Sequence, residues 1–105
     1  MHWIYLIIAS VFEIGWPFGF KMATLSTYKY IWIIFAVISM ALSGYFLYLA
    51  QQKIDISIAY IIWTGLGAAG TLLIGIIYFN EPYSLLKLFF FFMILTGIIG
   101  LKLTY

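Results

Sequence analysis

Four long apolar runs separated by short polar stretches dominate this sequence and limit what it can fold into. The runs cover residues 3–20, 30–50, 56–79 and 85–101. Each is close to the 20 or so apolar residues that an α-helix needs to cross the hydrocarbon core of a bilayer. With 67% hydrophobic and only 8% charged residues, the chain has too little polar surface for a soluble domain. The sequence therefore predicts an all-α membrane protein, a single domain of four transmembrane helices.

The few polar residues also exclude several classes of function. Five lysines, three acids and no cysteine leave no basic surface for nucleic acid and no thiolate for a metal or a nucleophile. Residues 65–70 fit the spacing G-x-G-x-x-G, but they lie inside an apolar run rather than after a strand. The pattern therefore does not indicate a dinucleotide site. We expect no enzyme activity, no cofactor and no metal.

The lysines do not favour one orientation in the membrane. With four spans, Lys53 and Lys102 lie on one side together with the α-amine, and Lys21, Lys29 and Lys87 lie on the other. Orientation follows the side with more positive charge, and here the two sides are nearly equal. We therefore predict dual topology, in which copies insert both ways and pair as an antiparallel homodimer. The alternative is one orientation, fixed by something outside the sequence.

Glu13 is the one charged residue in the middle of a run. An ionisable group at bilayer depth costs at least about 2.5 kcal/mol, so it marks a functional site by default. The alternative is a protonated side chain that only hydrogen-bonds a neighbouring helix. No lysine is deep enough in the membrane to neutralise the acid, so we expect its partner to come from outside the protein.

Polar and aromatic residues repeat around Glu13 at helical spacing. Ser10, Glu13 and Trp16 share one helical face, and Pro17, four residues after the acid, predicts a kink there.

The other runs carry matching groups. Tyr60 and Trp63 share a face of the third run, and Ser43 adds a hydroxyl from the second. Gly65 and Gly67 permit close packing or a hinge in the third run. On the fourth run, Thr96, Gly97 and Gly100 form a stripe of small residues and a candidate oligomer contact.

A buried acid of this kind can exchange two ligands. An apolar environment disfavours a charged carboxylate, so the group can hold a proton, or release it and attract a cation. If the site opens alternately to the two sides, proton entry is coupled to cation exit. Aromatic walls and a carboxylate suit an organic cation, with guanidinium-type and quaternary ammonium ions as the two candidates.

The chain resembles the small multidrug resistance family of bacterial transporters along nearly its whole length. The matching positions are Phe12, Glu13, Trp16 and Lys21, residues 59–67, Glu81-Pro82, and residues 97–102. The resemblance implies four helices, antiparallel dimers and proton-coupled export of cations from a bacterial cell, across its inner or plasma membrane.

Within that family, Trp16 and the ending of residues 97–102 are similar to the guanidinium-exporter branch. The resemblance makes Glu13 the shared site of proton and substrate, lined by Trp16, Tyr60 and Trp63, with Ser43 as a serine that hydrogen-bonds the acid. It makes Gly65 and Gly67 the hinge. Ser10 and Pro17 depart from the branch's usual residues beside the acid.

Three alternatives to a guanidinium antiporter stay open. One is a multidrug exporter of quaternary ammonium or polyaromatic cations. Another is an uncoupled channel or an accessory membrane subunit. The third is a heterodimer with a second homologous chain, an assembly that some members of the family use.

Overall fold

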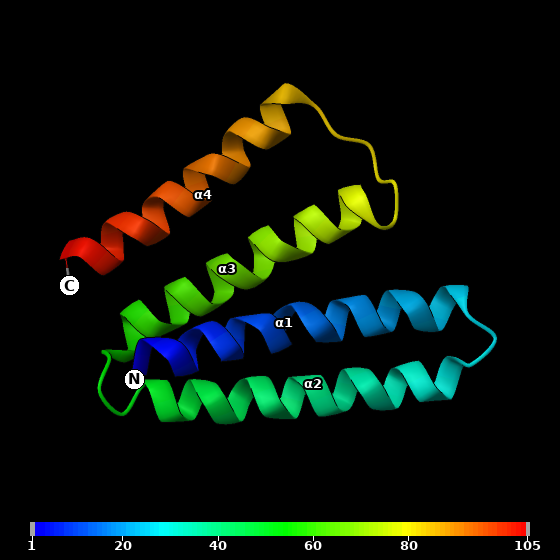
Figure 1. Ribbon diagram of the computed structural model, residues 1–105, viewed down its shortest axis with the longest axis horizontal. Coiled ribbons are helices and arrows are strands. Elements are labelled where there is room, and N and C mark those ends of the chain that lie inside the picture. Colours follow the sequence, from blue (N-terminus) through cyan, green and yellow to red (C-terminus); the bar gives the residue numbers. More distant parts are fainter. Residues whose placement is uncertain (1, 105) are drawn as a thin grey trace.

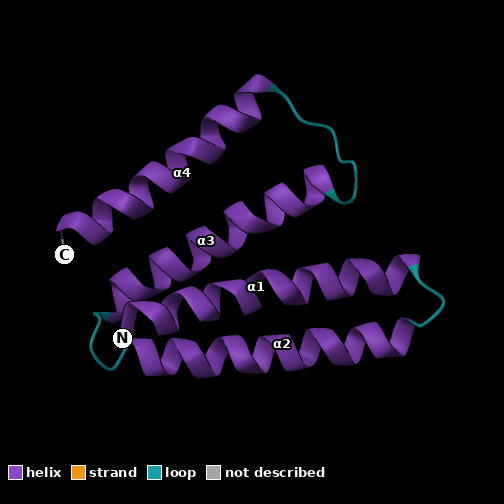
Figure 2. Ribbon diagram, viewed as in Figure 1, coloured by secondary structure: helices purple, strands orange, loops and turns teal. Residues whose placement is uncertain are grey.

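Residues 2–104 of the chain are described by a computed structural model, and within them four helices account for nearly every residue. They are α1 (His2–Leu25), α2 (Lys29–Ala50), α3 (Ile56–Ile77) and α4 (Leu85–Thr104). Figures 1 and 2 show them as long rods joined by short loops. All four are long and apolar enough to cross a membrane, which confirms the four spans expected from the sequence.

The helix ends differ from the predicted spans by a few residues. The stretch from Lys21 was expected to be a connector, but α1 continues to Leu25. The Thr24 hydroxyl donates to the Lys21 carbonyl at 2.6 Å, which satisfies a polar group within the last turn. In contrast, α3 ends at Ile77 rather than at residue 79. Asn80 has a left-handed φ of 55°, which ends the helical path of the chain.

The start of α4 follows the sequence prediction closely. The amide of Lys87 donates to the Ser84 side-chain oxygen at 3.2 Å, so Ser84 is the N-cap of α4. The Lys87 ammonium reaches back to the Pro82 carbonyl at 2.9 Å. A lysine one turn inside a span can thus keep its charge at the membrane edge.

Helix α1 lies between α2 and α3, and α4 packs along α3 on the outside (Figure 1). Small residues allow α1 and α2 to approach closely. A Cβ atom on Gly15 would lie 2.8 Å from the Ser39 hydroxyl oxygen, and one on Gly19 would lie 3.0 Å from the Ala36 Cβ. Such close approach replaces the hydrophobic driving force, which is weak between helices in lipid.

The apolar core lies at the end of the bundle where α1 begins. Leu6 and Ala50 meet Ala59 and Ile62 of α3 and Ile98 of α4, and Ile54 closes the cluster from the loop before α3. The ammonium of Lys102 lies 5.0 Å from the centre of the Trp3 ring, which links the end of α4 to the start of α1.

Most of the surface of α4 is not covered by the other helices within residues 2–104. Among residues 85–104, Phe91 and Ile98 are buried, and large apolar side chains such as Phe89, Phe92 and Met93 are more than half exposed. In a bilayer this surface can face lipid or a second protein chain without the cost it would have in water.

The tight α1–α2 contact gives a first prediction. A methyl group added by Gly19→Ala would meet Phe35, Ala36 and the Trp32 carbonyl at 2.9–3.2 Å. Overpacking of this kind costs about 1–3 kcal/mol. We expect Gly19→Ala to unfold at a lower temperature than the parent protein in detergent, as measured by circular dichroism. Gly44→Ala is the matched control, because nothing lies within 4 Å of its new methyl group. Equal unfolding temperatures for the two variants would contradict the close contact at Gly19.

Candidate functional site

Glu13 lies on the side of α1 that faces α3, directly against a glycine. A Cβ atom on Gly67 would lie 2.5 Å from Glu13 Cγ and 3.1 Å from Glu13 Cβ. Gly67 is buried and the Glu13 side chain is half-buried. The absence of a side chain at position 67 therefore makes the space that the acid occupies.

Trp16 holds the carboxylate from the same helix. Its indole Nε1 donates to Glu13 Oε1 at 2.5 Å, across one turn of α1. The i, i+3 spacing places the two side chains on one face, so this contact could be anticipated from the sequence. The bond holds one carboxylate oxygen in place, and both oxygens still have lone pairs that can accept from a ligand.

The acid opens into a groove between α1 and α3. The groove has a volume of about 330 Å³. Its lining residues are Glu13, Trp16, Pro17, Thr64, Gly67, Ala68 and Thr71. This is the size of a small-ligand pocket, and it joins a carboxylate to an aromatic ring, two hydroxyls and apolar walls.

Pro17 lies inside α1 without ending it. Because proline has no amide hydrogen, the Glu13 carbonyl loses its usual helical donor, although the helix continues to Leu25. The kink expected from the sequence stays a prediction, and Pro17 takes a place in the wall of the groove.

Ser43 binds different partners from those that the family resemblance implied. Its hydroxyl donates to the Ala9 carbonyl at 2.8 Å and accepts from Trp63 Nε1 at 2.8 Å. A hydroxyl has one hydrogen to give, and here it goes to the backbone of α1 one turn before Glu13, not to the acid. With 1% of its surface exposed, Ser43 ties α3, α2 and α1 together beside the groove.

Ser10 and Tyr60 do not touch the acid through any contact seen in residues 2–104. The Ser10 hydroxyl donates to the Leu6 carbonyl of its own helix at 2.8 Å. Tyr60 is 55% exposed, with its ring centre 5.6 Å from that of Trp63. Of the residues expected to line the site, Trp16 is the one that hydrogen-bonds Glu13 within residues 2–104.

The glycines expected to form a hinge have packing roles in the structure. Gly67 makes room for Glu13, and a Cβ on Gly65 would lie 2.8 Å from Ile98 Cδ1 of α4. Helix α3 is continuous through both. A hinge at these positions stays a prediction.

The candidate oligomer contact lies on the open surface of α4. Thr96 and Gly97 are exposed, and added Cβ atoms on Gly97 and Gly100 would meet nothing within 4 Å. The stripe is accessible to another helix, and contact with a second chain stays a prediction.

Thr71 is a site residue that the sequence reading missed. It lines the groove one turn beyond Gly67, and its hydroxyl donates to the Gly67 carbonyl at 2.7 Å. Thr64, Gly67 and Thr71 follow i, i+3, i+7 spacing. Continuing this spacing by one turn beyond Gly67 identifies Thr71 in the sequence.

Comparisons with known proteins all point to one family. Residues 1–94 match the family described as Small Multidrug Resistance protein. The chain is 42% identical over 103 residues to a probable guanidinium efflux system subunit GdnC of Bacillus licheniformis, covering 98% of this chain and 91% of the relative. It is 41% identical over 106 residues to a guanidinium exporter of Proteus vulgaris and 35% over 107 residues to one of Escherichia coli, covering 98% or more of each chain.

The buried network around Ser43 gives a second prediction. Ser43→Ala removes the acceptor of the Trp63 indole and the donor to Ala9. A buried polar group left without a partner costs about 1–3 kcal/mol. We expect a loss of stability of that size in denaturant titrations of the detergent-solubilised protein. Ser10→Ala removes only a bond within α1 and should cost less. An equal loss in both variants would contradict the interhelical role of Ser43.

Proposed function

The chain belongs to the small multidrug resistance family and is a multi-pass membrane transporter, and we propose that it exports small guanidinium-type cations in exchange for protons. Three relatives with 35–42% identity over nearly the full length carry guanidinium export or efflux in their names. The observation that carries the proposal is the Glu13 carboxylate, fixed by Trp16 at the edge of a groove between two membrane-spanning helices.

The groove supports a planar cation as substrate. A guanidinium ion donates paired hydrogen bonds to a carboxylate, a geometry that a quaternary ammonium ion cannot match because it has no N–H groups. Trp16 orients the Glu13 oxygens for such a pair and offers an aromatic face to the cation. Thr64 and Thr71 add hydroxyl oxygens along the α3 wall, and these can accept further N–H groups.

Cation export is coupled to protons because the cation and the proton share one acid, Glu13. The groove is lined by no other titratable side chain, so the charge of a bound cation must be balanced at Glu13. A proton and a cation then exclude each other, and a site that opens to each side in turn exchanges them. Such a cycle needs no bound cofactor, only a proton gradient.

A second copy in the opposite orientation completes the proposed transporter. The exposed small-residue stripe of α4, at Thr96, Gly97 and Gly100, provides a surface for close helix contact. Tyr60, exposed in the single chain, is free to line a cavity shared with the partner. Two antiparallel copies form an inverted pair around a site at mid-membrane, the arrangement by which many transporters alternate access.

Glu13→Gln tests the exchange site. The amide keeps the size of the side chain but neither ionises nor releases a proton, so guanidinium-evoked currents should vanish in solid-supported-membrane recordings of proteoliposomes. In the parent protein, the apparent KM for guanidinium should rise as the pH falls, because protons compete for the carboxylate. Asp55→Asn, which removes an acid from the loop before α3, should keep its currents.

Two outcomes would favour the other readings. Strong currents with tetrapropylammonium and none with guanidinium would identify a multidrug exporter. Flux that survives Glu13→Gln, or that ignores an imposed proton gradient, would identify an uncoupled channel or an accessory subunit.

Dual topology makes a separate prediction. The chain has no cysteine, so Tyr105→Cys creates a single label site at the C-terminus. With lysines balanced between the two sides, a membrane-impermeant maleimide should reach about half of the copies from each face of the cell membrane. Gln52→Cys, on the loop expected on the same side, should give the same split. Labelling from one face alone would show a fixed orientation.

A further inference from the structure

A second acid lies folded against α3 at the end of the molecule where α3 stops. Glu81 is in the loop after α3, and its amide donates to the Gly75 carbonyl at 3.0 Å. Its carboxylate lies directly over the same residue, because a Cβ atom on Gly75 would overlap Glu81 Oε1. Both the backbone and the side chain of Glu81 therefore contact α3 at Gly75, while the residue as a whole stays exposed.

The Glu81 carboxylate lines a cavity of about 160 Å³ between α1 and α3. The other lining residues are Ile14, Pro17, Phe18, Lys21, Thr71, Ile74, Gly75 and Phe79. Pro17 and Thr71 also line the groove that holds Glu13. The cavity and the groove therefore share two lining residues. Together they extend along the α1–α3 interface from Glu13 to Glu81.

The chemistry of this outer cavity matches that of the inner groove. Thr71 gives its hydroxyl hydrogen to Gly67, which leaves its oxygen as an acceptor in the cavity that Glu81 also lines. Phe18 and Phe79, with ring centres 5.7 Å apart, supply aromatic surface. A water molecule occupies about 30 Å³ in the liquid, so the cavity has room for a cation of four heavy atoms.

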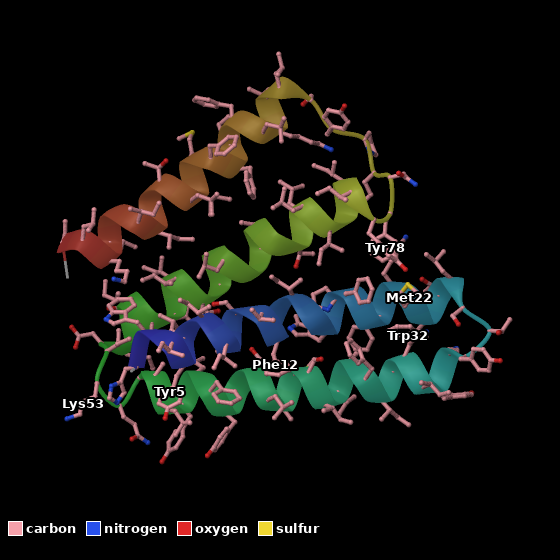
Figure 3. All side chains as sticks on the ribbon, viewed as in Figure 1. Tyr5, Phe12, Met22, Trp32, Lys53 and Tyr78 are labelled. Atoms are coloured by element: carbon pink, nitrogen blue, oxygen red, sulfur yellow. The ribbon has the colours of Figure 1, made fainter. Side chains whose placement is uncertain are left out.

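Aromatic side chains gather at this end of the molecule. The ring of Phe18 has its centre 5.4 Å from that of Tyr78 and 5.9 Å from that of Trp32. Figure 3 shows Tyr78 and Trp32 at the end of the bundle where the α3–α4 loop begins. Aromatic faces beside a carboxylate attract organic cations more than they attract hydrated metal ions.

We propose that Glu81 forms an outer cation-binding site, at which guanidinium docks on its way between the aqueous phase and Glu13. The inference rests on the proposed export function. An acid in a loop avoids most of the cost of an acid at mid-membrane and raises the local concentration of cations at the end of the path. Lys21 also lines the cavity, and its positive charge weakens the attraction of Glu81 for a cation, so a bound cation leaves readily. Guanidinium therefore binds the outer site only transiently.

Glu81→Gln tests the outer site in the full-length protein in proteoliposomes. Losing one charged hydrogen-bond partner at an exposed position should raise the KM for guanidinium roughly three- to tenfold, with the maximal current unchanged. Glu81→Asp keeps the charge and should stay near the parent KM. Gly75→Ala keeps the acid but displaces its carboxylate, and should raise the KM as Glu81→Gln does. Asp55→Asn removes an acid from a different loop and should leave the KM within about twofold of the parent.

The outcomes separate this inference from the export function. An unchanged KM in Glu81→Gln, with Glu13→Gln silent, would overturn the outer site and leave guanidinium exchange intact. A Glu81→Asp variant as impaired as Glu81→Gln would also overturn it, because the loss would then come from loop geometry rather than charge. Currents that persist in Glu13→Gln would instead refute the proposed function itself. Size-exclusion profiles of each variant establish that the protein tested is folded.

Discussion

Glu13 lies directly against Gly67, and the packing of α1 on α3 is organised around this contact. A carboxyl group inside a membrane needs polar partners and space, and the two come from different helices. Trp16, one turn further along α1, supplies the hydrogen bond. Gly67 of α3 supplies the space, since any side chain there would overlap the acid. The site therefore exists only where α1 and α3 lie close together, which fixes α1 as the middle helix of the chain.

Close helix approach and buried polar links hold this arrangement together, in addition to the apolar core at the end where α1 begins. Gly15 and Gly19 let α1 lie almost against the backbone of α2. The Ser43 hydroxyl then joins the Ala9 carbonyl of α1 to the Trp63 indole of α3. Because lipid tails are as apolar as leucine, such contacts supply much of what keeps membrane helices together. The same links keep the groove beside Glu13 in shape without filling it.

The single chain looks incomplete as a transporter in a specific way. Its groove is open to the outside, Tyr60 is exposed, and so are many side chains of α4. Figure 1 shows α4 at the edge of the chain, next to α3. All three are explained if a second copy covers them. The outer cavity at Glu81 differs, because both of its helical walls, α1 and α3, belong to one chain. In the proposed path, the outer site at Glu81 is formed within each chain, whereas the site at Glu13 is shared by the two chains.

Several features of this protein depend on local spacing and can be predicted from the sequence. Four apolar runs gave four spans, Ser84 capped α4, and the three-residue step from Glu13 to Trp16 placed donor and acceptor on one face. Which helices are neighbours depends instead on packing between distant parts of the chain. This packing directed Ser43 to Ala9, set Gly67 under the acid and folded Glu81 back onto α3. Helical periodicity fixes relations within about two turns, whereas contacts between distant residues depend on how small residues on separate helices fit together.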